Sequence, residues 1–265
     1  MKSKMSSEFI FQMFALLIAI IVVHAAYVGV IRPSADAQLQ RQMEMQAAGE
    51  EFVPQRTMAV VIRDFEQETC FILLIWALAI MAYKGRRTMA ENKILERALL
   101  DIPEGTSVLP EDARVYSRSL EALPDEEQDL LVPRTLLSAL QRFATTGSIQ
   151  AVSDTIKEQC EIESDRLDTE LSMVRYIAWA IPSIGFIGTV RGIGDALGQA
   201  YKAVEGDISG VTVSLGVAFN STFVALVLSI IIMFCLHQLQ LSQERLVLNG
   251  QRYADKRLLR FLVVR

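Results

Sequence analysis

The feature that most constrains this chain is an apolar run from about Phe9 to Ile31, because it contains no Asp, Glu, Lys or Arg. An α-helix rises about 1.5 Å per residue, so a run of this length can cross a hydrocarbon core of about 30 Å. The apolar region of a signal peptide is normally only about 7–15 residues long, and no A-x-A cleavage site follows cleanly. We therefore predict a retained membrane-spanning helix.

Three further apolar blocks follow the first one. The second block is short and ends at a basic cluster, which is typical of the cytoplasmic end of a span. Hydrophobic residues make up 51% of the 265-residue chain and charged residues 22%, which excludes a disordered chain and fits a membrane protein. Residues 1–31 contain the N-terminal segment and the first predicted span. The other three spans are predicted at 69–84, 173–200 and 211–237.

The basic residues around these blocks predict an orientation. They precede the first span, follow the second, open the third and follow the fourth, so the positive-inside rule places both termini in the cytoplasm. The soluble parts are then a periplasmic helical loop at 32–68, a cytoplasmic helical domain at 85–172, a short periplasmic turn at 201–210 and a C-terminal cytoplasmic helix at 238–265.

Helical periodicity dominates the soluble parts, and no β-alternation rivals it, so the predicted fold is all-α with four transmembrane helices that extend into a cytoplasmic helical domain. Gly147 is expected to end one helix, and Ser148 or Ser153 to cap a long helix that runs unbroken through Leu171 into the third span. The other helices are expected at Ser34–Gly49, Arg56–Gln67, Thr88–Asp101 and Pro133–Thr145.

Several function classes are disfavoured by the same sequence. A net charge of −5 argues against a nucleic-acid partner. No catalytic triad, metal-ligand spacing or phosphate loop is present, so we expect no enzyme, no metal and no cofactor. The three cysteines, Cys70, Cys160 and Cys235, are expected to be free. His24 is the one histidine of the first span, and it serves either a function or a hydrogen bond to a neighbouring helix.

The third and fourth spans carry stripes of small residues. Helical spacing puts Pro182, Gly185, Thr189, Gly192 and Ala196 on one face of the third span. Ser214, Ala218, Ser221, Ala225 and Ser229 share one face of the fourth, and Asn220 and Thr222 flank this second stripe. Such stripes either allow close helix packing or line a polar passage, and Pro182 frees the carbonyl of residue 178 and is expected to kink its helix.

The run PSIGFIGTVRGIGDAL, followed about 20 residues later by SLGVAFNSTFVALVLSIIIMF, resembles the paired signature helices of the MotA/TolQ/ExbB proton-channel family. This specific motif covers roughly residues 180–232, and the order of spans and cytoplasmic domain is similar to that family as well. Four spans with the large domain between the second and third resemble the flagellar-stator branch. The outer loop of about 37 residues is longer than a stator hairpin, so the branch stays open.

The resemblance implies an ion-driven motor in the bacterial inner membrane. It implies a homopentameric ring around two copies of a single-pass partner that has an intramembrane Asp and a periplasmic domain. Thr189 then lies on the ion pathway, and Pro182 couples ion binding to movement of the ring. The candidates for this pathway on the fourth span are Ser214, Asn220, Ser221 and Thr222. This segment can be aligned to the family motif in more than one register.

The remaining expected roles follow from spacing or from position. Close packing is expected at Gly185, Gly188, Gly192, Ala218 and Ala225. Arg191 and Asp195 are candidates for the pore mouth, and an interfacial anchor is an equal alternative for them. The 85–172 domain, with 18 acidic and 8 basic residues from Thr88 to Ser172, is either a solvated surface or the docking site of a basic cytoplasmic partner.

Two other functions are weighed against the motor subunit. One is a structural membrane scaffold whose small-residue helices only pack. The other is a self-sufficient transporter, which is disfavoured because the sequence shows no inverted repeat. Hydroxyl groups serve H⁺ and Na⁺ equally, so the sequence leaves the ion open, as it does the process that the motor drives.

Overall fold

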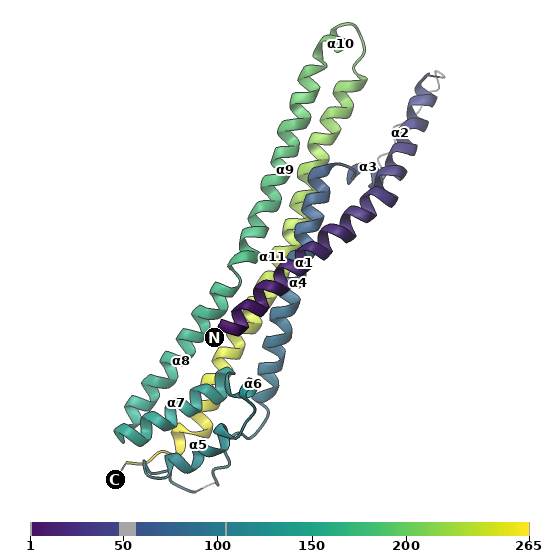
Figure 1. Ribbon diagram of the computed structural model, residues 1–265. Coiled ribbons are helices and arrows are strands. Elements are labelled where there is room, and N and C mark those ends of the chain that lie inside the picture. Colours follow the sequence, from purple (N-terminus) through teal and green to yellow (C-terminus); the bar gives the residue numbers. More distant parts are fainter. Residues whose placement is uncertain (1, 48–56, 104, 265) are drawn as a thin grey trace. The chain divides into compact units, whose positions relative to one another are not determined.

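The computed structural model describes residues 2–47, 57–103 and 105–264 (Figure 1). Within them the backbone is almost wholly helical, and the only pairing of β type is an isolated parallel bridge between Val108 and Leu262. Four helical stretches of the described residues are long and apolar enough to cross a membrane: Ser7–Gln42, Phe65–Ile94, Ile149–Gly198 and Ser209–Phe261. The prediction of an all-α chain with four candidate membrane helices is confirmed.

The chain divides into two compact units. The first unit consists of Met1–Ala82 and Met173–Leu236, and the second of Tyr83–Ser172 and His237–Arg265. The helices of the first unit, some of which continue into the second, are α1 (Lys2–Ala26), the π-helical turn Tyr27–Ile31, α2 (Arg32–Ala47), α3 (Met58–Val61), α4 (Phe65–Ile94), α9 (Ser172–Gly198), α10 (Ala200–Val204) and α11 (Ser209–Arg257).

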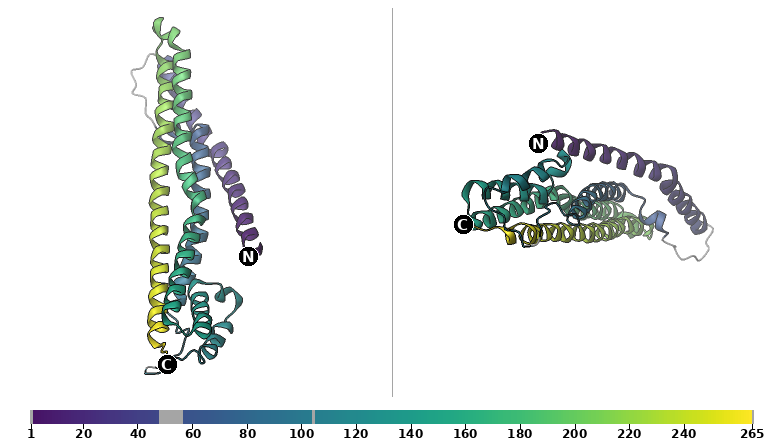
Figure 2. Two further views of the ribbon diagram at one scale, coloured as in Figure 1. Left: turned by 90° about the vertical axis from the view of Figure 1, so that its left-hand side faces the viewer. Right: turned by 90° about the horizontal axis from the view of Figure 1, so that it is seen from below.

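In the first unit, α9 and α11 run side by side and are joined by α10 (Figures 1 and 2). The connection turns at Gly206, whose φ of +100° is a conformation that favours glycine. Asp207 then accepts hydrogen bonds from the hydroxyl and the backbone N–H of Ser209, and these bonds lower the pKa of the Asp207 carboxyl. The Asp207 carboxylate also lies just before the N-terminus of α11, where a negative charge interacts favourably with the helix dipole.

Some helix boundaries differ from the predicted ones. α1 passes into α2 through the π-helical turn without a break, and Gly49 and Arg56 lie outside the described residues. The helix predicted to run as far as Gln67 is a single turn, α3, and α4 starts separately at Phe65. Two acidic residues in the first turn of α4 favour this start, because they lie at the positive end of the helix dipole.

The helix predicted at Thr88–Asp101 is also wrong as a separate element, because Thr88 lies inside α4, which ends at Ile94. The residues after Ile94 leave the helix and enter the core of the second unit, where Leu100 is buried. The Tyr253 hydroxyl fixes this segment, since it donates to the carbonyl of Arg97 at 2.8 Å and accepts from the N–H of Leu99 at 2.9 Å.

The second unit is built around one hydrophobic core. Its own helices are α5 (Ala113–Glu121), α6 (Asp125–Gln128), α7 (Leu131–Thr146) and α8 (Ile149–Glu170), and the last turns of α11 complete it. Gly147 ends α7 in the left-handed conformation, and Ser148 caps α8 by accepting from the N–H of Ala151. A one-residue turn at Leu171 separates α8 from α9, where the sequence predicted an unbroken helix.

Three helices of the second unit are tied together by buried charges. Glu163 of α8 is fully buried and bonds two guanidinium groups, those of Arg134 of α7, at 2.8 Å, and of Arg166. Lys84 of α4 is 2% exposed and bonds Glu170 of α8 at 2.7 Å. Because buried charges are tolerated only when paired, these contacts fix how the three helices are aligned.

We expect Glu163→Gln to destabilise the second unit strongly. The substitution keeps the side-chain volume but removes the counter-ion of Arg134 and leaves Arg166 with only the longer ion pair to Glu170, which costs about 3 kcal/mol in the free energy of unfolding. Chemical unfolding of the purified chain, followed by circular dichroism, measures this loss. Glu127→Gln is the matched control, because its ion pair with Arg97 is exposed and contributes at most about 1 kcal/mol. Equal losses in the two variants would contradict the role given to Glu163.

Candidate functional site

The two small-residue stripes lie directly against each other. A Cβ atom added at Gly185 would lie 2.5 Å from the Cβ of Ala225, and one added at Gly192 would lie 2.7 Å from the backbone N of Ala218. Gly188 is in the same position relative to Ser221, whose Cβ would be 2.5 Å away. No side chain larger than hydrogen fits at these places without a shift, so the glycines allow the backbones of α9 and α11 to approach each other closely.

Two threonines lie at this contact. The Thr189 hydroxyl of α9 and the Thr222 hydroxyl of α11 hydrogen-bond each other, and each is half-buried. Thr189 also lies 3.1 Å from the carbonyl oxygen of Ala218, and Thr222 lies 3.3 Å from that of Gly185. We call Thr189 and Thr222 the threonine pair.

The threonine pair has two orders of donation, because each hydroxyl carries one proton and can both donate and accept. In one order Thr222 donates to Thr189, which donates to the carbonyl of Ala218. In the other, Thr189 donates to Thr222, which donates to the carbonyl of Gly185. Reversing the order moves no heavy atom, and in each order the hydroxyl that donates to the other threonine keeps its lone pairs for a neighbouring water molecule or ion.

Pro182 has a specific partner on α11. A proline inside a helix lacks the N–H that the carbonyl four residues earlier would accept, and here that carbonyl belongs to Ala178. The Ser229 hydroxyl donates to it at 3.2 Å, and both residues are buried. The last serine of the fourth-span stripe therefore satisfies the carbonyl that the proline frees.

The first turn of α4 contacts three helices through three consecutive side chains. Glu66 forms a bidentate ion pair with Arg191 of α9, with N–O distances of 2.7 and 2.9 Å. Gln67 is 1% exposed, and its Nε2 donates to the hydroxyl of Ser221 at 3.3 Å. Glu68 is buried and bonds the first helices of the unit. Successive helical residues point about 100° apart, which lets one turn reach three neighbours.

Glu68 forms the centre of a charged cluster. One carboxylate oxygen lies 2.7 Å from Nδ1 of His24, and the other bonds the guanidinium of Arg32. Arg32 also lies over the ring of Phe65, 4.5 Å from its centroid. His24 therefore makes the hydrogen bond to a neighbouring helix that was one of the two roles expected for it. Sequence reasoning missed the contact because 44 residues separate the partners, and an intramembrane histidine was the one signal for it.

The other predicted residues divide by burial. Ser214, Ser221, Ala218 and Ala225 are buried at the contact, and the Ser214 hydroxyl accepts from Gln199 at 3.0 Å. Asn220 is half-buried, beside the contact. These small side chains pack between α9 and α11. The half-buried threonine pair lies at the edge of this packing.

The two pore-mouth candidates, Arg191 and Asp195, differ in their ion pairs. Arg191 is committed to Glu66, and Asp195 lies 3.8 Å from it as a weaker second partner. Asp195 itself is exposed. Across residues 2–47, 57–103 and 105–264, no cluster of three His, Cys, Asp or Glu side chains could hold a metal ion.

The glycine contacts predict opposite effects at two nearby positions. Gly192→Ala places a methyl group within 2.8 Å of backbone atoms of Ala218 and Ser214, so the helices must separate, at a cost of about 1–3 kcal/mol. Gly194→Ala meets no atom within 4 Å and is expected to be neutral or slightly stabilising, because alanine favours helices. Thermal unfolding of the two purified variants in detergent compares them. If the two variants unfold at the same temperature, the close contact of α9 and α11 at Gly192 is contradicted.

The comparisons with known proteins address residues 127–251, which include α7, α8, α9 and the threonine pair. This stretch matches the model of the MotA/TolQ/ExbB proton channel family. No curated protein and no solved structure matches the chain. The resemblance seen at 180–232 is thereby confirmed and extended toward both termini. Residues 127–251 of the chain are therefore similar to the MotA/TolQ/ExbB proton channel family.

Proposed function

We propose that this chain is the channel-forming subunit of an ion-driven motor in the bacterial inner membrane. It couples the flow of H⁺ or Na⁺ to rotation of, or force on, a single-span partner that carries an intramembrane Asp and a periplasmic domain. Five copies form a ring around two copies of the partner, and both termini of each copy lie in the cytoplasm. The family match supports the channel class, and the stoichiometry and orientation are carried over from the resemblance and the positive-inside rule.

The observation that carries the proposal is the threonine pair. Its two hydroxyls lie within the matched region, are half-buried, and can reverse their order of donation. A reversible hydroxyl pair passes a proton to the Asp of the partner or helps to bind Na⁺ without holding a fixed charge in the membrane. Avoiding a fixed charge matters because an unpaired charge in the hydrocarbon region is costly.

Pro182 supplies the coupling in this proposal. The carbonyl of Ala178 is held by Ser229 through a side chain instead of through the backbone ladder of α9. A side-chain hydrogen bond exchanges more readily than a helical one, so α9 can bend here when the partner changes its protonation. One charge that crosses 100 mV supplies about 2.3 kcal/mol, enough to bias a step between equivalent positions of a ring.

A structural scaffold remains the second candidate, and a specific observation favours it. Most of the small side chains lie in the direct contact between α9 and α11. Helix packing alone would explain why they are small. In a scaffold the threonine pair would serve only as a hydrogen bond between the two helices, with no ion passing it. The two functions therefore differ in what the hydroxyl of Thr189 contributes.

Thr189→Val tests the proposal. Valine keeps the shape of threonine and removes the hydroxyl, so we expect the assembled complex to lose about tenfold in ion flux, the effect of one unmet hydrogen bond of about 1.4 kcal/mol. The measurement is H⁺ and Na⁺ entry, read with ion-sensitive dyes, into liposomes that contain the chain with the single-span protein encoded beside it. An imposed membrane potential drives the ion.

Two further variants control this experiment. Thr189→Ser restores the hydroxyl and is expected to restore most of the flux. Thr212→Val makes the same chemical change at an exposed threonine of α11, and it is expected to have no effect. Wild-type complexes that conduct neither ion would support the scaffold, and a Thr189→Val complex with full flux would remove Thr189 from the pathway.

A further inference from the structure

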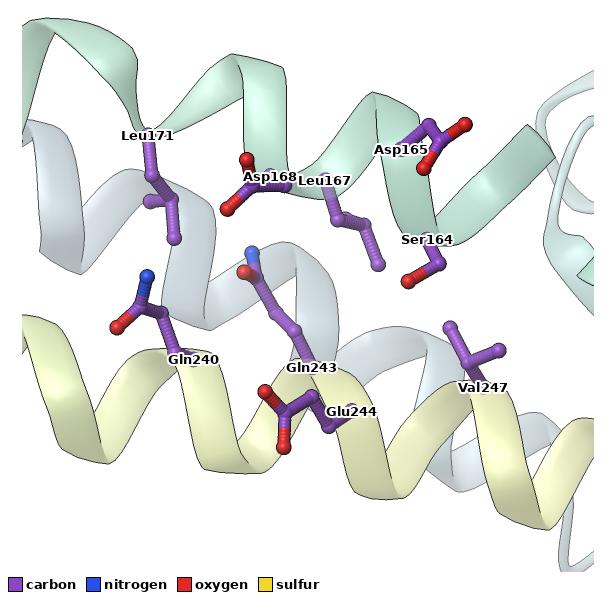
Figure 3. Close-up of a pocket in the computed structure, with 9 residues that line it drawn as sticks. All are labelled: Ser164, Asp165, Leu167, Asp168, Leu171, Gln240, Gln243, Glu244 and Val247. Atoms are coloured by element: carbon purple, nitrogen blue, oxygen red, sulfur yellow. The ribbon is translucent and has the colours of Figure 1, made fainter. Parts of the chain in front are cut away.

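A pocket in the second unit lies between α8 and α11 and has a volume of about 270 Å³ (Figure 3). α8 contributes Asp165 and Asp168 to its lining, and α11 contributes Glu244. None of the nine lining residues is a cation. Leu167 and Leu171, both buried, give the pocket an apolar floor.

Gln243 supplies an independent sign that this pocket holds a ligand. Its side chain is 4% exposed, and its Nε2 has no hydrogen-bond partner in the described part of the chain. Figure 3 shows the amide extending from α11 toward α8, into the pocket. A buried donor without an acceptor costs about 1–3 kcal/mol, so such a group is normally satisfied by something that binds there.

The chemistry of the lining defines the occupant. The carboxylates of Asp165 and Glu244 favour a cationic group, the apolar floor suits the aliphatic stem of lysine or arginine, and the amide of Gln243 needs an acceptor such as a peptide carbonyl. A free cation or a polyamine has no acceptor to offer. A basic peptide segment meets all three requirements.

The position of the pocket along the chain indicates which basic segment this is. Leu171 and Gln240 lie within a few residues of the points where the chain passes between the two units, next to the ends of the predicted third and fourth spans. A single-span protein whose outer domain follows its span has its N-terminus in the cytoplasm, and the positive-inside rule gives the segment before that span an excess of Lys and Arg.

We propose that the pocket binds the basic cytoplasmic segment that precedes the span of the partner subunit. This inference rests on the proposed function, since it takes the partner and the orientation from it. This contact gives each copy of the chain a binding site for the partner outside the membrane. Binding depends on attraction between charges, so salt is expected to weaken it.

The test uses the purified full-length chain in neutral detergent and a fluorescein-labelled hexa-arginine peptide as the probe. Fluorescence anisotropy is expected to show binding that weakens as salt is raised. In the double variant Asp165→Asn/Glu244→Gln the dissociation constant is expected to rise about tenfold, since two partly screened ion pairs are lost. Gln243→Leu keeps the volume, removes the amide, and is expected to weaken binding as well.

Glu158→Gln is the matched control, because Glu158 is an exposed acid of α8 outside the pocket lining. It is expected to bind the peptide within twofold of the wild-type chain. Equal weakening in Glu158→Gln and the double variant would mean a general attraction to the acidic surface and would overturn the proposal. So would a double variant whose ring has a different mass by light scattering, because a second copy of the chain would then be the occupant.

The proposed function and this inference fail separately. Peptide binding requires no ion flow, so a loss of flux in Thr189→Val says nothing against the pocket. If hexa-arginine does not bind at low salt, the pocket is not a basic-segment site, and the threonine pair keeps its own test. If it binds and is cross-linked by a terminal benzophenone to residues outside 164–171 and 240–247, the proposal is wrong as well.

Discussion

The close approach of α9 and α11 is the constraint on which the first unit depends. Lipid gives two apolar helices no hydrophobic reason to associate, so van der Waals contact and hydrogen bonds must hold them together. Glycines on α9 face alanines and serines on α11, which lets backbone meet backbone. At this distance threonine hydroxyls reach each other and the opposite carbonyls, so the polar bonds of the site follow from the packing.

The first turn of α4 completes this arrangement from a third side. Its glutamates pair with Arg191 and with the cluster of His24 and Arg32, while the glutamine between them bonds Ser221. Each partner comes from a different helix. Because the charges of Glu66 and Glu68 are neutralised by arginine, the turn adds orientation to the helix contacts without leaving an uncompensated charge.

The second unit uses charge in two different ways. Glu163 is buried and paired, so it fixes α7 against α8. The carboxylates around Gln243 are exposed and line a pocket with no cation in its walls. A buried pair stabilises one arrangement of the chain itself, whereas the exposed carboxylates of Asp165 and Glu244 can attract a second molecule. The excess of acidic residues in this unit therefore includes Glu163, which has a structural role, and the pocket carboxylates, for which we propose a binding role.

The sequence by itself determined the all-α class, the four candidate membrane helices and the family domain, because apolar length and small-residue spacing are local properties of the chain. It also placed the cap at Ser148 and the helix end at Gly147, which depend on a few neighbouring residues. Only the tertiary structure decided which groups meet across long separations. Glu68 with His24, Ser229 with the carbonyl freed by Pro182, and Gln243 in its pocket each join helices far apart in sequence, and no periodicity encodes such a distance.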